Sequence, residues 1–235
     1  MKRQLFVFIM LLMAGPVWAG SSNLDSKPYL RVGLGAASLQ ESSGQLTDLG
    51  SSIDQLDFAS ETVFWGELEA GATVFKGIAP ALRIKAAIDQ ELGDIYTNED
   101  GATYAFDLSV DSYLFALDLN VDIAEILDKE WPVRPFVGAT VGAVYHDVSE
   151  LTFPSSTESL DSASNWDFAW GVSAGVRYFL GSNIAVDLTY RYEDMGEAEL
   201  SDLALIAGSI DGTLPNTAKA EIHTHSIGVG LAYYF

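Results

Sequence analysis

The chain of 235 residues contains no cysteine and few basic residues. The lack of cysteine excludes disulfide bonds and thiol chemistry. Only 12 Lys and Arg residues stand against 33 Asp and Glu, which gives a formal net charge of −21 at pH 7. Because contacts to a nucleic-acid backbone require basic groups, this acidic balance makes nucleic acid a very poor partner.

The chain also lacks an apolar stretch long enough to cross a bilayer as a helix, which needs about 20 residues. Residues 1–19 combine two basic residues, an apolar run at 5–13 and a small-residue cleavage site ending at Ala19. We interpret this segment as a cleaved signal peptide for export, and Gly20 in place of a cysteine argues against a lipoprotein. Removal of its two basic residues takes the formal charge from −21 to −23. After export, a membrane-spanning chain of this kind requires a closed β-barrel.

The last nine residues alternate between large apolar and small side chains. One face carries Ile227, Val229, Leu231, Tyr233 and Phe235, while glycine and alanine occupy most of the other. This alternation is typical of a strand with lipid on its outer face and a narrow lumen on its inner face. The five residues resemble the terminal signal of Gram-negative outer-membrane barrels. The resemblance implies that the barrel assembly machinery reads them.

Period-two alternation recurs in eight segments, separated in turn by long acidic loops and short turns. The segments are 29–39, 62–75, 81–90, 107–121, 133–145, 166–179, 184–194 and 221–235. The short connections are 76–80, 122–132 and 181–183, and the long ones are 40–61, 91–106, 146–165 and 195–220. The expected fold is all-β: residues 20–235 form a membrane-spanning, up-and-down antiparallel β-barrel of about eight strands. With an exported N-terminus, parity places the four long acidic loops outside the cell.

Charged residues of the predicted strands fall on inward positions, because a charge facing lipid costs about 2 to 4 kcal/mol near the midplane. Spaced inward glycines leave room for their long side chains. We expect either a salt-bridged plug or a selectivity filter, and the small bore of eight strands favours the plug. The predicted lumenal charges are Glu67, Glu69, Arg83, Lys85, Asp118, Arg177, Asp187 and Arg191.

Two hairpins predict particular pairs among these charges. If the connection after the sixth segment is a three-residue loop, Arg177 lies opposite Asp187. A tight turn after the second segment would bring Glu69 near Lys85 or diagonal to Arg83.

Aromatic residues near the strand ends predict two interfacial girdles. One would contain Tyr29, Phe75, Tyr178 and Tyr233, and the other Phe64, Trp170 and Tyr192. Apolar residues at helical spacing in the first and fourth long loops predict short amphipathic helices that cap the barrel. They are Leu46, Leu49, Ile53 and Leu56, and Leu200, Leu203, Ala204 and Ile206.

Three histidines are the remaining candidates for chemistry. His223 and His225 share an outward face near the loop rim and could hold a metal with a loop carboxylate. Two ligands make no closed site, so polar contact at the headgroup level is the favoured interpretation. His146 follows the fifth segment and is expected to be a solvated loop residue. The sequence thus predicts no catalytic residue, metal or cofactor.

Residues 168–179 and 183–196 resemble the penultimate hairpin of small eight-stranded outer-membrane barrels related to the N-terminal domain of outer-membrane protein A and to the opacity proteins. Residues 134–142 resemble their fifth strand. The resemblance implies a bacterial outer-membrane location, in contact with membrane lipids and lipopolysaccharide. It implies a structural protein, an adhesin, a narrow channel or a lipid A-modifying enzyme.

We expect a non-enzymatic barrel that acts in outer-membrane integrity and in surface interaction through its loops. The alternatives are a low-conductance channel for small solutes and a lipid A-modifying enzyme. The acidic loops would meet anionic lipopolysaccharide through divalent cations, or bind a host or surface ligand.

Overall fold

A computed structural model describes eleven ranges of the chain. They are residues 27–41, 44–47, 52–56, 62–91, 94–97, 103–106, 109–148, 151–152, 159–160, 163–200 and 218–235. The signal peptide expected at residues 1–19 lies outside them. Within these ranges, no helix is long and apolar enough to cross a bilayer.

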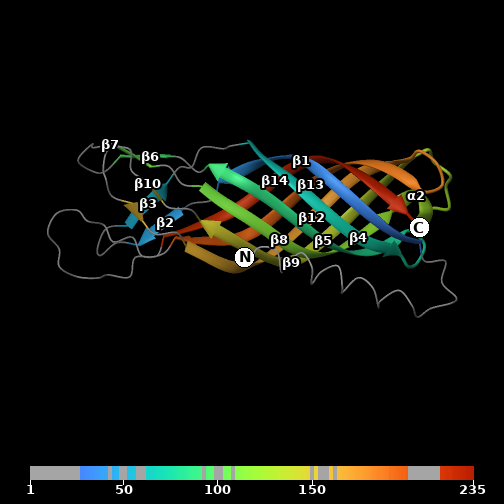
Figure 1. The fold of residues 1–235 in the computed structure, drawn as a ribbon, viewed down its shortest axis with the longest axis horizontal. Coiled ribbons are helices and arrows are strands. Elements are labelled where there is room, and N and C mark those ends of the chain that lie inside the picture. The colour runs from blue at the N-terminus through green and yellow to red at the C-terminus, as the bar shows by residue number, and fades with distance from the viewer. Residues whose placement is uncertain are drawn as a thin grey trace, which may run out of the picture.

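Eight long strands form a closed antiparallel barrel (Figure 1). Each strand pairs with the next, and the last pairs with the first, so that the sheet has no free long edge. All eight predicted segments are confirmed, although six of the strands extend further towards the long loops than the alternation indicated, the exceptions being β4 and β8. The strands are β1 (Lys27–Glu41), β4 (Thr62–Thr73), β5 (Ile78–Glu91), β8 (Ser109–Asp122), β9 (Val133–Val148), β12 (Ala163–Phe179), β13 (Ile184–Leu200) and β14 (Ala218–Tyr234).

Short connections close one end of the barrel, which we call the short-turn end. The β4–β5 turn uses left-handed backbone at Lys76 and Gly77, with φ of 24° and 76°. The β8–β9 connection contains a short helix, α2 (Ile123–Ile126), whose N-cap Asp122 accepts a hydrogen bond from the Glu125 amide at 3.0 Å. This cap satisfies an amide that the helix itself leaves unpaired.

The opposite end, which we call the long-loop end, carries additional small hairpins. They are β2 (Gly44–Thr47) with β3 (Ser52–Leu56), β6 (Asp94–Thr97) with β7 (Thr103–Phe106), and β10 (Leu151–Thr152) with β11 (Ser159–Leu160). The helix expected in the first long loop is therefore wrong. Leu46 pairs with Ile53 and with Ala218 of β14, so strand pairing satisfies the backbone there. Leu200 lies at the end of β13, and the rest of the fourth-loop prediction falls outside the described residues.

The long strands alternate between an exposed apolar face and a buried face. In β14, Ile227, Val229, Leu231, Tyr233 and the following Phe235 are exposed, while the residues between them are buried. Of the aromatic residues expected on the outside, Tyr29 alone is placed wrongly. Its side chain is 2% exposed and donates a 2.6 Å hydrogen bond to Glu69. The phenol points inward because it shares the parity of the inward glycines of β1.

Side chains fill the barrel interior in three layers. Tyr29, Tyr234 and four small alanines pack together at the short-turn end. A layer of charged residues occupies the middle of the strands. Apolar residues around Trp65, Leu114 and Met195 pack together towards the long-loop end. The interior is thus a packed core rather than an empty tube.

Gly35 and Gly66 provide a matched test of this packing on neighbouring strands. A Cβ at Gly35 would overlap the Ile227 carbonyl oxygen and lie 2.6 Å from the Trp65 ring, whereas a Cβ at Gly66 meets nothing within 4 Å. Gly35→Ala should therefore lower the free energy of unfolding by about 1 to 3 kcal/mol, and Gly66→Ala should change it by less than about 0.5 kcal/mol. Urea unfolding of the refolded barrel measures both. Equal effects would show that the interior beside Trp65 is loosely packed.

Candidate functional site in the barrel interior

The middle layer contains equal numbers of basic and acidic side chains. Among the described residues, the buried charges are five basic groups, Arg31, Arg83, Lys85, Arg177 and Arg191, and five acidic groups, Glu67, Glu69, Asp118, Asp187 and Glu193. The structure places all eight residues selected from the sequence in this layer. Equal charge matters because an isolated buried ion is strongly unfavourable, whereas a paired one is tolerated.

Glu67 lies at the centre of the layer and contacts three guanidinium groups. Its Oε1 accepts hydrogen bonds from Arg31 and, at 3.3 Å, from Arg191. Its Oε2 accepts one from Arg83 at 3.3 Å. The Glu67 side chain has no exposed surface, so protein groups alone compensate its charge.

Arg83 links opposite walls of the barrel. Its Nε donates to Asp118 of β8 at 2.6 Å, and its Nη2 donates to Glu193 of β13 at 2.8 Å. Lys85 also pairs with Glu193. The contacts of Arg83 and Lys85 with Glu193 cross the lumen, because β5 and β13 are not neighbours in the sheet.

Of the two positions expected for Glu69, beside Lys85 or diagonal to Arg83, neither holds, since Glu69 lies directly opposite Arg83. The register pairs Glu69 with Arg83 and Glu67 with Lys85. The Glu69 carboxylate accepts hydrogen bonds from Tyr29 at 2.6 Å and from Asn120 at 3.3 Å. Lys85 turns away, towards the long-loop end.

Asp187 is held mainly by a residue that the sequence analysis overlooked. Arg177 lies opposite Asp187 in the register, as predicted, but their nearest nitrogen and oxygen atoms are 3.8 Å apart. Arg31 instead binds Asp187 with two nitrogens, Nη2 at 2.7 Å and Nε at 2.9 Å. The parity of Arg31 with Gly33 would have revealed it as an inward residue. Glu193 was overlooked in the same way, although it shares the parity of Asp187 and Arg191.

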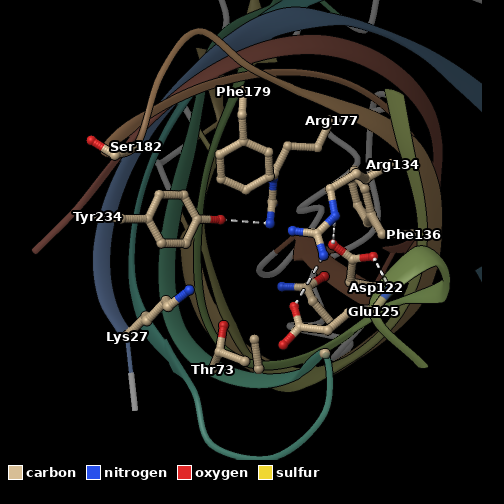
Figure 2. Close-up of a pocket in the computed structure, with 13 residues that line it drawn as sticks. Lys27, Thr73, Asp122, Glu125, Arg134, Phe136, Arg177, Phe179, Ser182 and Tyr234 are labelled. Carbon is tan, nitrogen blue, oxygen red and sulfur yellow. Dashed lines mark hydrogen bonds and ion pairs between the residues drawn. The ribbon is translucent and has the colours of Figure 1, made fainter. Parts of the chain in front are cut away.

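A small pocket opens below this layer at the short-turn end (Figure 2). Its cavity volume is about 70 Å³, and its lining includes Lys27, Asp122, Glu125, Arg134 and Arg177. Arg134 pairs with Asp122 at 3.2 Å and with Glu125 at 3.3 Å. The pocket is therefore a polar recess whose ion pairs come from β8, α2 and β9.

His146 is not the solvated loop residue that the sequence indicated. It lies in β9, is 0% exposed and faces the interior, because this strand continues beyond the predicted end. Its Nε2 lies 2.9 Å from the Met195 carbonyl oxygen and its Nδ1 lies 3.0 Å from Ser112 Oγ. Since a carbonyl oxygen only accepts, Nε2 carries the proton and Nδ1 accepts from the Ser112 hydroxyl.

His223 and His225 lie on the outward face of β14, among aromatic side chains. His225 Nδ1 is 2.6 Å from the Tyr190 hydroxyl, and His223 lies 3.7 Å from carboxylate oxygens of both Asp194 and Glu221. Within the part of the chain that the structure describes, no three His, Asp or Glu side chains form a group suited to a metal ion.

Comparison with known proteins identifies an outer-membrane fold. Residues 6–235 match the family model described as "Outer membrane protein beta-barrel domain". The chain is 33% identical over 70 residues to the outer membrane protein PagN of Salmonella typhimurium, covering 28% of this chain and 29% of PagN. It is 30% identical over 129 residues to an uncharacterized protein of Brucella abortus, covering 46% of this chain and 43% of that protein. The matched regions thus span less than half the length of these relatives.

Two solved structures share the architecture at low sequence identity. The outer membrane protein OprG from Pseudomonas aeruginosa matches with a TM-score of 0.58 and 14% identity, over 89% of this chain and 96% of OprG. Neisserial surface protein A matches with a TM-score of 0.54 and 16% identity, over 88% of this chain and 97% of that protein. At these identities the likeness establishes the fold alone.

The unequal contacts of Asp187 predict unequal energetic coupling. In double-mutant cycles, Arg31→Met combined with Asp187→Ala should show a coupling energy of roughly 1 to 3 kcal/mol, because each single change leaves an unpaired buried charge. Arg177→Met combined with Asp187→Ala should show less than about 1 kcal/mol, because the two groups are 3.8 Å apart. Unfolding of the refolded variants gives both values. Strict additivity for Arg31 would contradict the observed pairing.

Proposed function

This chain belongs to the outer membrane protein β-barrel domain family, and from that premise we propose that it acts without catalysis, in outer-membrane integrity and in surface interaction through its loops. The short-turn end faces the periplasm, and the long-loop end faces the outside of the cell. The barrel wall meets membrane lipid and lipopolysaccharide, as befits its exposed apolar side chains.

The filled interior is the observation that carries this proposal. The ten charged side chains of the middle layer are 1–7% exposed, and Arg83–Glu193 and Arg191–Glu67 pair across the lumen. A continuous aqueous path would require Arg83 to move away from Glu67 and Glu193, which would leave buried charges unpaired. The arrangement favours a structural plug over a selectivity filter. The wall and the loops are then the surfaces through which the protein interacts with its surroundings.

The position of the Ser112–His146 pair also supports a non-enzymatic role. A serine hydroxyl hydrogen-bonded to a neutral histidine is an arrangement found in nucleophilic catalytic sites. Both residues are at most 1% exposed and lie inside the barrel, where a lipid in the surrounding membrane cannot reach them. His146 is further occupied by the Met195 carbonyl oxygen. The pair instead ties β8 and β9 to β13 within the apolar layer.

The exposed side of β14 suits the assembly role expected from the sequence. Phe235 is 67% exposed, its amide donates to the Pro28 carbonyl oxygen at 3.0 Å, and its ring contacts that of Tyr233. The backbone of Phe235 is thus bonded to β1, where the barrel closes, and its ring is exposed on the outer face of the barrel. We infer that the assembly machinery recognises this face before closure.

The fourth long loop offers a direct test of the surface role. Leu200 and Ala218 already pair, so a two-residue Asn-Gly turn can replace residues 201–217. The variant should fold and insert as the unaltered barrel does, since loop closure depends only weakly on loop length. We expect it to lose attachment of bacteria to glass or to cultured epithelial cells, measured with equal amounts of protein in the membrane.

A control alters the periplasmic turn region instead, by replacing the exposed Lys129 and Glu130 with Gly-Ser at unchanged length, which should leave attachment unchanged. If the bacteria still attach after removal of residues 201–217, the surface role belongs to another loop or to the barrel wall. Loss of the folded barrel would show that this loop belongs to the core.

A further inference from the structure

Arg177 lines the periplasmic pocket with much of its hydrogen-bonding capacity unused. A guanidinium carries five N–H donors. Arg177 Nη1 donates to the Tyr234 hydroxyl at 2.8 Å, and Nη2 lies 3.8 Å from Asp187. Its Nε is buried and has no hydrogen-bond partner. This Nε is closed off from any water-sized group, so a ligand in the cavity would bond the Nη groups, of which Nη2 comes no nearer to Asp187 than 3.8 Å.

The pocket is built to keep this guanidinium in place. Arg177 lies over the Phe136 ring, 5.0 Å from its centroid, and Arg134 lies over the Phe179 ring at 5.3 Å. Figure 2 shows the two arginines and Lys27 approaching the same recess from different strands, β12, β9 and β1. Stacking on aromatic rings and fixed ion pairs reduce the side-chain entropy that binding would otherwise cost.

The charge of the lining favours an anion. Three basic residues, Lys27, Arg134 and Arg177, face two acidic ones, Asp122 and Glu125. Both acidic groups pair with Arg134, and Arg177 lies 3.8 Å from Asp187, so Lys27 alone of the three basic residues has a charge that no described carboxylate within 4 Å offsets. An excess of positive charge is unusual in a chain with a formal net charge of −21. The cavity of about 70 Å³ is large enough for a small oxyanion.

We propose that the periplasmic mouth of the barrel binds a small oxyanion, with carboxylate or phosphate oxygens accepting from the Arg177 guanidinium and the charge of Lys27 assisting. The planar guanidinium matches the oxygens of both anions. This site is separate from the long-loop surface and shares only Arg177 with the charged layer above it, so it adds a ligand to the barrel without opening the lumen.

Arginine side-chain NMR tests the proposal on residues 20–235, refolded in a non-ionic maltoside detergent. The Arg177 Nε–Hε signal, identified by its loss in Arg177→Lys, is followed during titration with inorganic phosphate and, separately, with acetate. Sodium chloride at matched ionic strength is the reference. We expect a saturable shift of this signal with at least one oxyanion. Comparison of the phosphate and acetate titrations shows which of the two anions binds more tightly.

Lys27→Gln and Lys76→Gln are a matched pair of variants, because both remove an exposed lysine at the same end of the barrel. Lys27 lines the pocket, whereas Lys76 lies in the β4–β5 turn and pairs with Asp128. Lys27→Gln should weaken binding roughly two- to fivefold, as expected for one exposed charge, and Lys76→Gln should leave it unchanged. Neither variant disturbs the buried layer, so the comparison holds even if Arg177→Lys fails to fold.

Two results would overturn the proposal. An Arg177 signal that responds to phosphate and acetate no more than to chloride would mean that the cavity holds water alone. Equal weakening by Lys27→Gln and Lys76→Gln would mean that the anion responds only to the general charge of this end.

Discussion

The structure depends on one constraint: charges placed inside a narrow barrel must be neutralised by one another. Burial removes water from these groups, so each carboxylate requires a cation within reach. Glu67 meets this requirement with three arginines, and Glu193 with Arg83 and Lys85. The pairs of Glu67 with Arg191 and of Glu193 with Arg83 and Lys85 join strands that the backbone ladder does not connect. Pairing across the lumen therefore favours one strand register over others, in the way that buried polar groups specify structure elsewhere.

The same constraint explains the distribution of small residues. Arginine and lysine side chains reach across the interior only where the facing position is small, and a Cβ at Gly230 would overlap the Arg31 guanidinium. Large apolar residues are correspondingly placed outside, where lipid surrounds them. Inside, they are concentrated around Trp65, whose ring lies 5.1 Å from the Lys85 nitrogen and so separates the charged layer from the apolar one.

Much of this architecture could be predicted from alternation, because a period of two determines which face each residue occupies. The eight strands and the inward charges followed from that rule, and the Arg177–Asp187 register followed from the expected three-residue turn. The partners across the lumen did not, since they depend on the stagger of strands far apart in the sheet. His146 was misplaced because β9 continues beyond its most apolar part. The helical spacing in the first long loop misled for a related reason: pairing with β14 outweighed local periodicity.

Conductance across a planar bilayer tests the central claim most directly, because a neutralised and packed interior leaves no continuous path for ions. Residues 20–235 would be refolded and inserted into planar bilayers, and their insertion verified independently by protection of the strands from protease. The account predicts no steady unitary current at moderate voltage. A reproducible, ion-selective conductance of the folded barrel would contradict it and would make the layer around Glu67 and Arg83 a selectivity filter.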